Sequence, residues 1–486
     1  MTDPPAAQSF QPHELVDPPQ IWNTSAVTQA DLDGDGHLDL IVGNYYPDGA
    51  RVLDADATGR EQMNQSFSRA DNGGRNRLFL AVPAARDSQS ADADSQVTFR
   101  EATDVLADEV ACGWTFGIGA ADLDGDLLPE IYFVQDFGPD RLLHNRSRPG
   151  QLEFALLQGE RGFTTPRSKV LGGDSFNGMG LDFGDVNGDG TPDIFVSNIT
   201  ADFGLHESNF LFVSRQQDLP RMQQGIAPYR DDSEPLGVSR SGWTWDARLA
   251  DFNNDGVLEA LQASGFVKGS VDRWPEMQEL GVSNDRVVSD PRAWPHLLPG
   301  DDISGGDHNP FFVRASDGRF HDLAAAIGIA EPMCTRGIAL ADIDGDGRLD
   351  FAVANQWESS YVFQNAAPDA GAFLGLHLRL PVGDVGILST TGVQAGHPRH
   401  DVASRPAIGA VATVQLADGR SLTAQVDGGT GHSGKRSPDL LFGLGRDAAD
   451  AAVPVTVRWR GTDGRIRTES LQVAPGWHAV LLRDTP

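Results

Sequence analysis

A nine-residue acidic motif occurs five times along the chain. Its copies begin at Asp31, Asp122, Asp185, Asp251 and Asp342, and the fifth reads Asp-Ile-Asp-Gly-Asp-Gly-Arg-Leu-Asp. The starts lie 91, 63, 66 and 91 residues apart. This spacing indicates a unit of about 60 residues with insertions in the first and fourth copies. Short β runs flank each motif, and about four short strands per unit are typical of the blades of a β-propeller, so we expect an all-β fold.

The motif has the oxygen pattern of a calcium site. Side-chain oxygens at positions 1, 3, 5 and 9 and a backbone carbonyl at position 7 form the cage that Ca²⁺ prefers, and Gly at position 6 permits a sharp turn. We therefore predict up to five Ca²⁺ ions and no organic cofactor. Leu127 replaces that Gly in the second copy, and we expect it to strain the loop. The alternative is Asx-rich turns that bind nothing. The predicted ligands are Asp31, Asp33, Asp35, His37, Asp39; Asp122, Asp124, Asp126, Leu128, Glu130; Asp185, Asn187, Asp189, Thr191, Asp193; Asp251, Asn253, Asp255, Val257, Glu259; and Asp342, Asp344, Asp346, Arg348, Asp350.

The repeated unit resembles a known family. Strand–DxDGDGxxD–strand units are similar to those of calcium-binding FG-GAP/VCBS propellers, as in integrin α subunits. Four later segments, 405–414 (RPAIGAVATV), 429–432 (GTGH), 437–445 (SPDLLFGLG) and 455–459 (VTVRW), resemble an ASPIC/UnbV domain. The combination is similar to the cartilage acidic protein family and its bacterial relatives. The resemblance implies seven blades, while the five loops leave five or six blades as the alternative.

These boundaries predict three parts of the chain. We expect an N-terminal tail over residues 1–20, an FG-GAP/VCBS β-propeller over 21–370 and an ASPIC/UnbV-like β region over 371–486. In one alternative, strands from the last part complete the propeller ring.

The strands before the third and fourth motifs break the pattern of the other copies. Elsewhere, small residues mostly occupy the positions three and five before the motif, but here these positions include Asp182, Asp246 and Arg248. Charged groups at crowded positions are costly to bury unless they are paired or used. One interpretation makes Asp246 or Asp182 a general acid and Arg248 the group that holds an anionic part of a substrate. Asp246→Asn would then abolish turnover and leave folding intact. The alternative is a structural ion pair.

Aromatic and polar side chains lie a few residues further upstream in these strands. We expect them to line one rim of a central funnel and to bind substrate, or alternatively to fill space between blades. The long insertion over 265–302 is interpreted as a lid or binding loop, or as a decorative excursion. The predicted rim residues are Trp114, Phe116, Asn177, Trp243, Trp245 and Arg336.

The charge balance excludes two classes of partner. The chain has 38 Lys and Arg against 69 Asp and Glu, a formal charge of −31. Nucleic acid phosphate and anionic membranes would repel such a protein. No apolar run approaches the roughly 20 residues of a membrane span. No secretory signal is visible, so we expect a cytoplasmic protein, or a secreted one if the sequence is a processed form.

Two functions from different classes fit these observations. The first is a cyclase or alkylating enzyme of natural-product biosynthesis, acting on an apolar small molecule by redox-free cyclisation or carbon–carbon bond formation. The resemblance implies this chemistry, because the UnbV name is associated with natural-product gene clusters and some similar calcium-loop propellers catalyse alkylation. The alternative is a non-catalytic, calcium-dependent binding or adhesion propeller that recognises a protein or glycan. The missing signal favours the enzyme, and the missing catalytic motif favours the binding protein.

Overall fold

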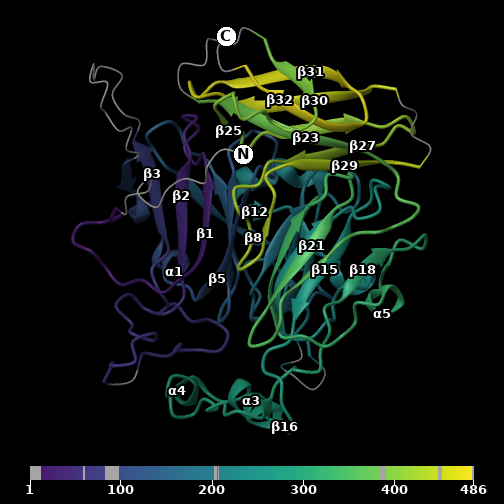
Figure 1. Cartoon of the computed structure of the whole chain (residues 1–486). Helices are drawn as coiled ribbons and strands as arrows, with labels where there is room; N and C mark the ends of the chain where they lie inside the picture. Colours follow the sequence, from purple (N-terminus) through teal and green to yellow (C-terminus); the bar gives the residue numbers. More distant parts are fainter. Residues whose placement is uncertain are drawn as a thin grey trace.

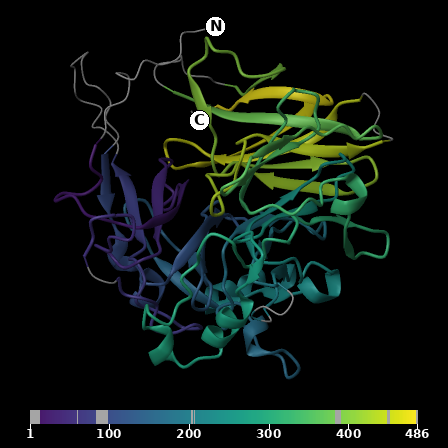
Figure 2. The same cartoon turned by 60° about the horizontal axis from the view of Figure 1, so that its bottom comes forward.

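The computed structural model describes residues 13–58, 61–82, 98–201, 205, 207–382, 390–446 and 451–483. Within these ranges the chain is mostly β, as predicted, and forms a group of five sheets below a β-sandwich (Figure 1). In the second view, the strands of the sandwich again form a group of their own next to the five sheets (Figure 2). Residues 1–12 of the expected N-terminal tail fall outside the described ranges.

Each acidic motif connects the first two strands of its own sheet, and these sheets are consistent with propeller blades. We call them blades 1 to 5. Blade 1 contains β1 (Thr24–Ala30), β2 (Asp39–Asn44), β3 (Arg77–Val82) and β4 (Thr98–Glu101); blade 2 contains β5 (Thr115–Ala121), β6 (Glu130–Gln135), β7 (Arg141–Asn145), β8 (Phe154–Gly159) and β12 (Ile226–Ala227); blade 3 contains β9 (Leu181–Gly184), β10 (Asp193–Val196), β11 (Phe210–Ser214) and β13 (Tyr229–Asp231); blade 4 contains β14 (Thr244–Ala250), β15 (Glu259–Ser264), β18 (Phe311–Arg314) and β19 (Phe320–Asp322); blade 5 contains β20 (Thr335–Ala341), β21 (Asp350–Asn355), β22 (Tyr361–Phe363) and β28 (Lys435–Arg436).

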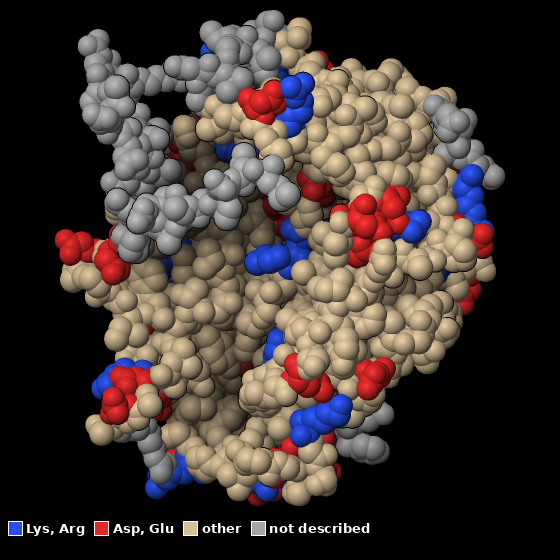
Figure 3. Space-filling model, in the orientation of Figure 1, with Lys and Arg blue, Asp and Glu red and all other residues tan. Residues whose placement is uncertain are grey.

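The first strands of successive blades pack side by side in chain order, β1 on β5, β5 on β9, β9 on β14 and β14 on β20. The described residues thus form five blades, one for each acidic motif, and not the seven that the family resemblance implied. The face in Figure 3 is hollowed below the sandwich, and basic side chains lie at the edge of the hollow.

After Gly371 the chain builds a separate β-sandwich and adds no further complete blade. Its two sheets enclose a core of their own, which includes Leu374, Leu376, Val457 and Trp459. One sheet contains β23 (Ala372–Pro381), β24 (Gly392–Ala395), β25 (Ser404–Pro406), β29 (Leu440–Gly445) and β32 (Gly476–Leu481); the other contains β26 (Val411–Gln415), β27 (Ser421–Gln425), β30 (Val453–Arg460) and β31 (Ile466–Val473).

The helices are short and lie in the connections. The insertion between blade-4 strands carries α3 (Trp274–Gly281) and α4 (Asp285–Val288), flanked by β16 (Val271–Asp272) and β17 (Asp301–Asp302). It lies at the end of the blades that faces away from the sandwich (Figure 1). Within the described ranges the other helices are α1 (Asp108–Ala111), α2 (Ser233–Leu236), α5 (Ala324–Ile327) and the 3₁₀ segments Thr103–Val105, Arg167–Lys169 and Gln216–Gln224.

A β-bulge recurs near the start of the first strand in four blades. A bulge leaves one residue unpaired and changes where its side chain points, so the period-2 alternation is interrupted there. Three of the bulged positions, Phe116, Trp245 and Arg336, are predicted rim residues. The register shifts between Thr24 and Ala26, Thr115 and Gly117, Thr244 and Asp246, and Thr335 and Gly337.

Candidate functional site

The acidic loops bring carboxylates together as a cation site requires. In the first loop, oxygens of Asp31, Asp33 and Asp39 all lie within 4.8 Å of one another. Burial raises the pKa of Asp31 to about 7 and that of Asp39 to about 8, against backbone hydrogen bonds that lower both. Such a crowded anionic set fits a divalent cation, whose charge would offset the cost of keeping the carboxylates ionised. The same close grouping occurs for Asp122, Asp124 and Asp126 and for Asp342, Asp344 and Asp350.

The third and fourth loops differ from the others at position 3. The amide of Asn187 donates a hydrogen bond to Asp189, and the amide of Asn253 donates to Glu259. An uncharged amide at this position weakens the demand for a cation, because it replaces one anionic oxygen by a neutral group.

The last carboxylate of each loop also has a structural task. Asp39 accepts hydrogen bonds from the backbone N–H groups of Leu32 in its own loop and Ala81 at the end of β3, both at 2.8 Å. The pattern recurs at Glu130, Asp193 and Asp350, with partners Asn145 and Ser214 in the third strand and Asn365 just after it. In blades 1 to 3 position 9 therefore joins the acidic loop to the third strand, and in blade 5 to the residues just after that strand, whereas Glu259 of blade 4 accepts from Phe252 and Asn253 of its own loop.

The departure at Leu127 has the expected conformational consequence. Leu127 has φ 64°, in the left-handed region where a side chain is disfavoured, whereas the equivalent Gly36 and Gly347 have φ 91° and 85°.

The second acidic loop also contacts a histidine that the sequence did not predict as part of the site. Nε2 of buried His144 lies 3.2 Å from Asp124 Oδ2, and Arg146 donates to His144 Nδ1 at 3.4 Å. A neutral His144 that accepts at Nδ1 carries its proton on Nε2, so it orients Asp124 by donating to it.

Four of the five loops contact the sandwich. Arg460 of β30 donates to Leu127 O at 3.2 Å and pairs with Asp31 at 3.6 Å. Trp477 Nε1 donates to Asp342 Oδ2 at 2.8 Å, and Arg420 donates to Asp255 O at 3.1 Å. The candidate calcium loops therefore lie at the joint between blades and sandwich, where a bound ion would order both.

The sequence-predicted acid–arginine cluster does assemble. Asp246 and Arg248 are both completely buried, with 3.1 Å between Asp246 Oδ1 and Arg248 Nη2. Asp246 Oδ2 accepts from the backbone N–H of Ile338 on the next blade at 3.0 Å, and Asp182 Oδ2 accepts from that of Leu249 at 2.8 Å. The charged side chains thus join the inner strands of blades 3, 4 and 5.

A loop from the sandwich covers this cluster. Residues 427–437, which we call the plug, pass from β27 to β28 and descend among the blades (Figure 1). Arg436 of the plug pairs with Asp182, and Arg248 donates to Thr430 O at 3.2 Å. A Cβ atom on Gly434 would lie 1.8 Å from Asp246 Oδ2, so only glycine fits there. The geometry therefore favours the structural ion pair over a catalytic Asp246 that substrate can reach.

The plug contacts the inner strand of every blade. Its Gly428 O accepts from Gln29 N of β1 at 3.3 Å, and its Gly431 N donates to Ile118 O of β5 at 2.9 Å. Arg436 and Thr430 reach β9 and β14, and β28 pairs in parallel with β20. The plug therefore lies among the inner strands of all five blades and contacts both the first, β1, and the last, β20.

The predicted aromatic rim also assembles, but it is filled. Trp243 and Trp245 are buried in a cluster with Met277 of the insertion, and Trp274 packs on Trp243 at 5.6 Å between ring centroids. Arg336 lies over Trp245 at 4.3 Å. Trp114 is almost fully buried, Phe116 packs edge-on against Trp245, and Asn177 donates to Asp136 at 3.0 Å. The insertion over 265–302 thus covers this end of the blades.

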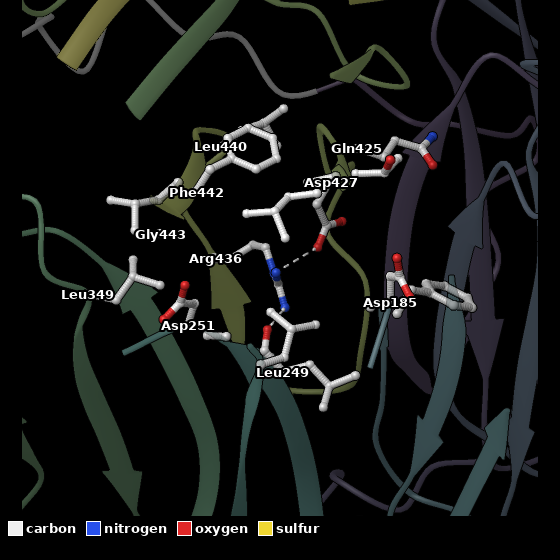
Figure 4. A pocket seen from close by; sticks show the side chains of 18 of the residues that line it. Asp185, Leu249, Asp251, Leu349, Gln425, Asp427, Arg436, Leu440, Phe442 and Gly443 are labelled. Atoms are coloured by element: carbon white, nitrogen blue, oxygen red, sulfur yellow. Dashed lines mark hydrogen bonds and ion pairs between the residues drawn. The ribbon is translucent and has the colours of Figure 1, made fainter. Parts of the chain in front are cut away.

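A cavity of about 430 Å³ lies at the opposite end, between blades 2 to 5 and the sandwich. Its walls are largely apolar and include Leu249, Leu340, Leu440 and Phe442. Arg436 projects into it, with its Nε 3.6 Å from Asp427 Oδ2 (Figure 4). Among the predicted catalytic residues, Asp182 lines this cavity, whereas Asp246 and Arg248 do not. Arg436 and Asp427 were missed from sequence because no local motif marks them.

Known family models match several parts of the chain. The FG-GAP-like repeat matches residues 122–196, the FG-GAP repeat matches 23–60 and 335–372, and the ASPIC and UnbV family matches 401–485. Three separate parts of the chain thus match FG-GAP repeats, and its C-terminal part matches the ASPIC and UnbV family, as the motifs predicted.

Two curated relatives give a more particular likeness. Cartilage acidic protein 1 of Mus musculus and of Homo sapiens are each 24% identical to the chain over 262 residues, or 49% of its length. The matched region spans 40% and 39% of these relatives, which are thus distant homologues. Among solved structures, the exotype rhamnogalacturonan lyase YesX aligns with 94% of this chain and 74% of its own, with 13% identity and a TM-score of 0.30. Among the described residues, each helix is too short or too polar to pass through a lipid bilayer.

Proposed function

We propose that this protein is a calcium-stabilised β-propeller that binds a small, largely apolar molecule in the cavity between its blades and its ASPIC/UnbV sandwich. The observation that carries this proposal is the cavity itself. Its volume of about 430 Å³ lies in the range of small-molecule sites, which are mostly apolar with a few placed polar groups. Up to five Ca²⁺ ions in the acidic loops would hold the two walls in position.

Polar groups inside the cavity define one end of the ligand. The charge of Arg436 is already met by Asp182 and Asp427, so a second full anion is not required there. Arg436 Nε is nevertheless buried without a hydrogen bond to the described residues. This Nε faces Asp427 Oδ2 at 3.6 Å, so the polar end of the cavity is an internally paired group beside which a neutral, weakly polar end of a ligand fits.

The structure bears on both functions that the sequence suggested, because it changes where a ligand can bind. Cyclisation or carbon–carbon bond formation at Asp246 would require the plug to leave the ring, because Gly434 lies directly over that carboxylate. A small apolar molecule remains the proposed ligand, and its site moves from the central funnel to the joint between blades and sandwich. Adhesion to a protein or glycan is the weaker alternative, since the aromatic rim that would serve it is covered by the insertion.

The test uses 8-anilinonaphthalene-1-sulfonate, a fluorescent probe whose aromatic rings bind apolar cavities and whose sulfonate can remain in solvent, with the full chain in excess Ca²⁺. Leu441→Trp places a larger side chain on the cavity wall, and we expect about tenfold weaker probe binding. Leu53→Trp is the matched control, because Leu53 is 95% exposed and does not line the cavity. Equal probe affinity in both variants, with near-ultraviolet circular dichroism unchanged, would show that the cavity is not the binding site.

A further inference from the structure

Three side chains form a hydrogen-bonded row on the sandwich side of the cavity. His377 Nδ1 lies 2.5 Å from Asp439 Oδ1, and His377 Nε2 lies 2.9 Å from His397 Nδ1. Ser437 donates its hydroxyl proton to the other oxygen of Asp439. All of these residues line the cavity. His377 comes from β23, His397 from the segment after β24, and Ser437 and Asp439 from the end of the plug and the residues just after it.

The row determines which nitrogen of each neutral imidazole carries the proton. The Asp439 carboxylate can only accept, and its pKa is lowered because the hydrogen bonds from His377 and Ser437 outweigh the opposing effect of burial. In its neutral form His377 therefore carries its proton on Nδ1 and accepts at Nε2. His397 must then donate from Nδ1, which leaves the lone pair of His397 on Nε2.

Neighbouring groups hold this arrangement in place. The indole of Trp477 stacks on His377 with 4.8 Å between ring centroids and an interplanar angle of 27°. The same indole donates through Nε1 to Asp342, the first carboxylate of the fifth acidic loop. His397 Nε2 has no hydrogen-bond partner among the described residues, and the His397 side chain is exposed on the cavity wall.

We propose that Nε2 of His397 accepts a proton from a molecule bound in the cavity, and that His377 and Asp439 are positioning residues that keep this nitrogen unprotonated. The proposal rests on the small-molecule site proposed above and names its ligand class, an apolar molecule with an acidic O–H such as a phenol or enol. The O–H bond breaks, an N–H bond forms on His397, and the electron pair stays on the ligand oxygen. Nothing is oxidised or reduced, and Asp439 offsets the positive charge of the resulting imidazolium.

The first test measures the availability of the lone pair with diethyl pyrocarbonate, which modifies unprotonated imidazole nitrogens. Mass spectrometry on the full, calcium-loaded chain compares His397 with His321, which pairs with Asp317 at the surface. Asp439→Asn should slow modification of His397 about fivefold or more, because an amide N–H facing His377 Nδ1 reverses the direction of the row. Asp439→Glu should restore part of the rate, and Asp317→Asn, the matched control, should leave His397 unchanged.

The second test reads the tautomers directly by ¹⁵N NMR of histidine-labelled protein. We expect Nδ1–H for both His377 and His397, and a change to Nε2–H for His397 in Asp439→Asn. Observing Nε2–H for His397 in the unmodified chain would overturn the proposal, as would an unchanged modification rate in Asp439→Asn.

Protection by 8-anilinonaphthalene-1-sulfonate separates this inference from the proposed function. If the probe binds in the cavity and slows modification of His397, both proposals are supported. If the predicted tautomers are found but the probe neither binds nor protects, the small-molecule site fails and the orientation of the row stands. If the probe binds and His397 carries Nε2–H, the proton-accepting role is refuted and the binding site stands.

Discussion

Replacing Asp246 by Asn tests the buried charge pair at the centre of the ring. The amide has nearly the same shape as the carboxylate, so the change removes a charge and leaves the packing. Arg248 would then be fully buried without its closest counter-charge. Breaking such a pair costs about 3 to 5 kcal/mol. Because Asp182 and Asp427 still act on Arg248, we take the lower end, about 3 kcal/mol.

The assay is differential scanning calorimetry of the calcium-loaded chain. If the chain unfolds as one unit, about 3 kcal/mol corresponds to a melting temperature roughly 3 °C lower. The double variant Asp246→Leu, Arg248→Met should recover much of this loss, since it removes both buried charges. Asp54→Asn, in an exposed pair with Arg51, should leave the melting temperature unchanged. If Asp246→Asn has the same melting temperature as the unmodified chain, the structural role of Asp246 is refuted. That result would favour the catalytic hypothesis, which expects the variant to fold normally.

Two further predictions concern metal and pH. Chelation of Ca²⁺ should lower the melting temperature markedly, because one site contributes about 2.7 kcal/mol to stability when the Ca²⁺ concentration is 100 times its Kd. An unchanged melting temperature would contradict the stabilising role of the acidic loops. Burial raises the pKa of Asp136 in the folded protein to about 6, although hydrogen bonds from Tyr45 and Asn177 lower it. In the unfolded chain the same carboxyl has an ordinary pKa of about 4. As the pH rises, the unfolded chain therefore loses this proton before the folded protein does. The contribution of Asp136 to the free energy of unfolding should therefore fall between about pH 4 and pH 6 and level off above pH 6. Asp136→Asn should remove about 3 kcal/mol of this decrease. The measurement is the difference between the urea midpoints at the two pH values. If the difference persists in the variant, Asp136 does not cause it.

The alternation along the inner strands was only partly predictable from the sequence. Downstream of the bulges, the apolar side chains at positions two and four before the motif include the buried Ile118, Leu249 and Ile338, whereas Val27 of blade 1 is 45% exposed. Upstream, the bulges at Phe116 and Trp245 interrupt the alternation, and a bulge depends on pairing with the neighbouring strand. The rim residues were therefore identified as a group, but their packing under the insertion was not.

The number of blades shows a similar limit. Each acidic loop marks one blade, but a count of loops cannot say what closes a ring. Here the plug of the sandwich pairs with β20 and contacts β1, so five blades suffice in the described structure. The resemblance to seven-bladed propellers could not reveal this, because the closing segment lies outside the repeats.

The sequence by itself determined the acidic loops and the β class, because turn chemistry within nine residues depends on local Asp oxygens and on glycines that accept positive φ. It also located the three charged residues that break the inner-strand pattern. Only the tertiary structure decided what these charges do. Asp182 meets Arg436 across 254 residues of chain, and His377, His397 and Asp439 meet through three separate segments. The first contact depends on how the plug enters the blades and the second on how the strands of the sandwich pair, and no local pattern encodes either.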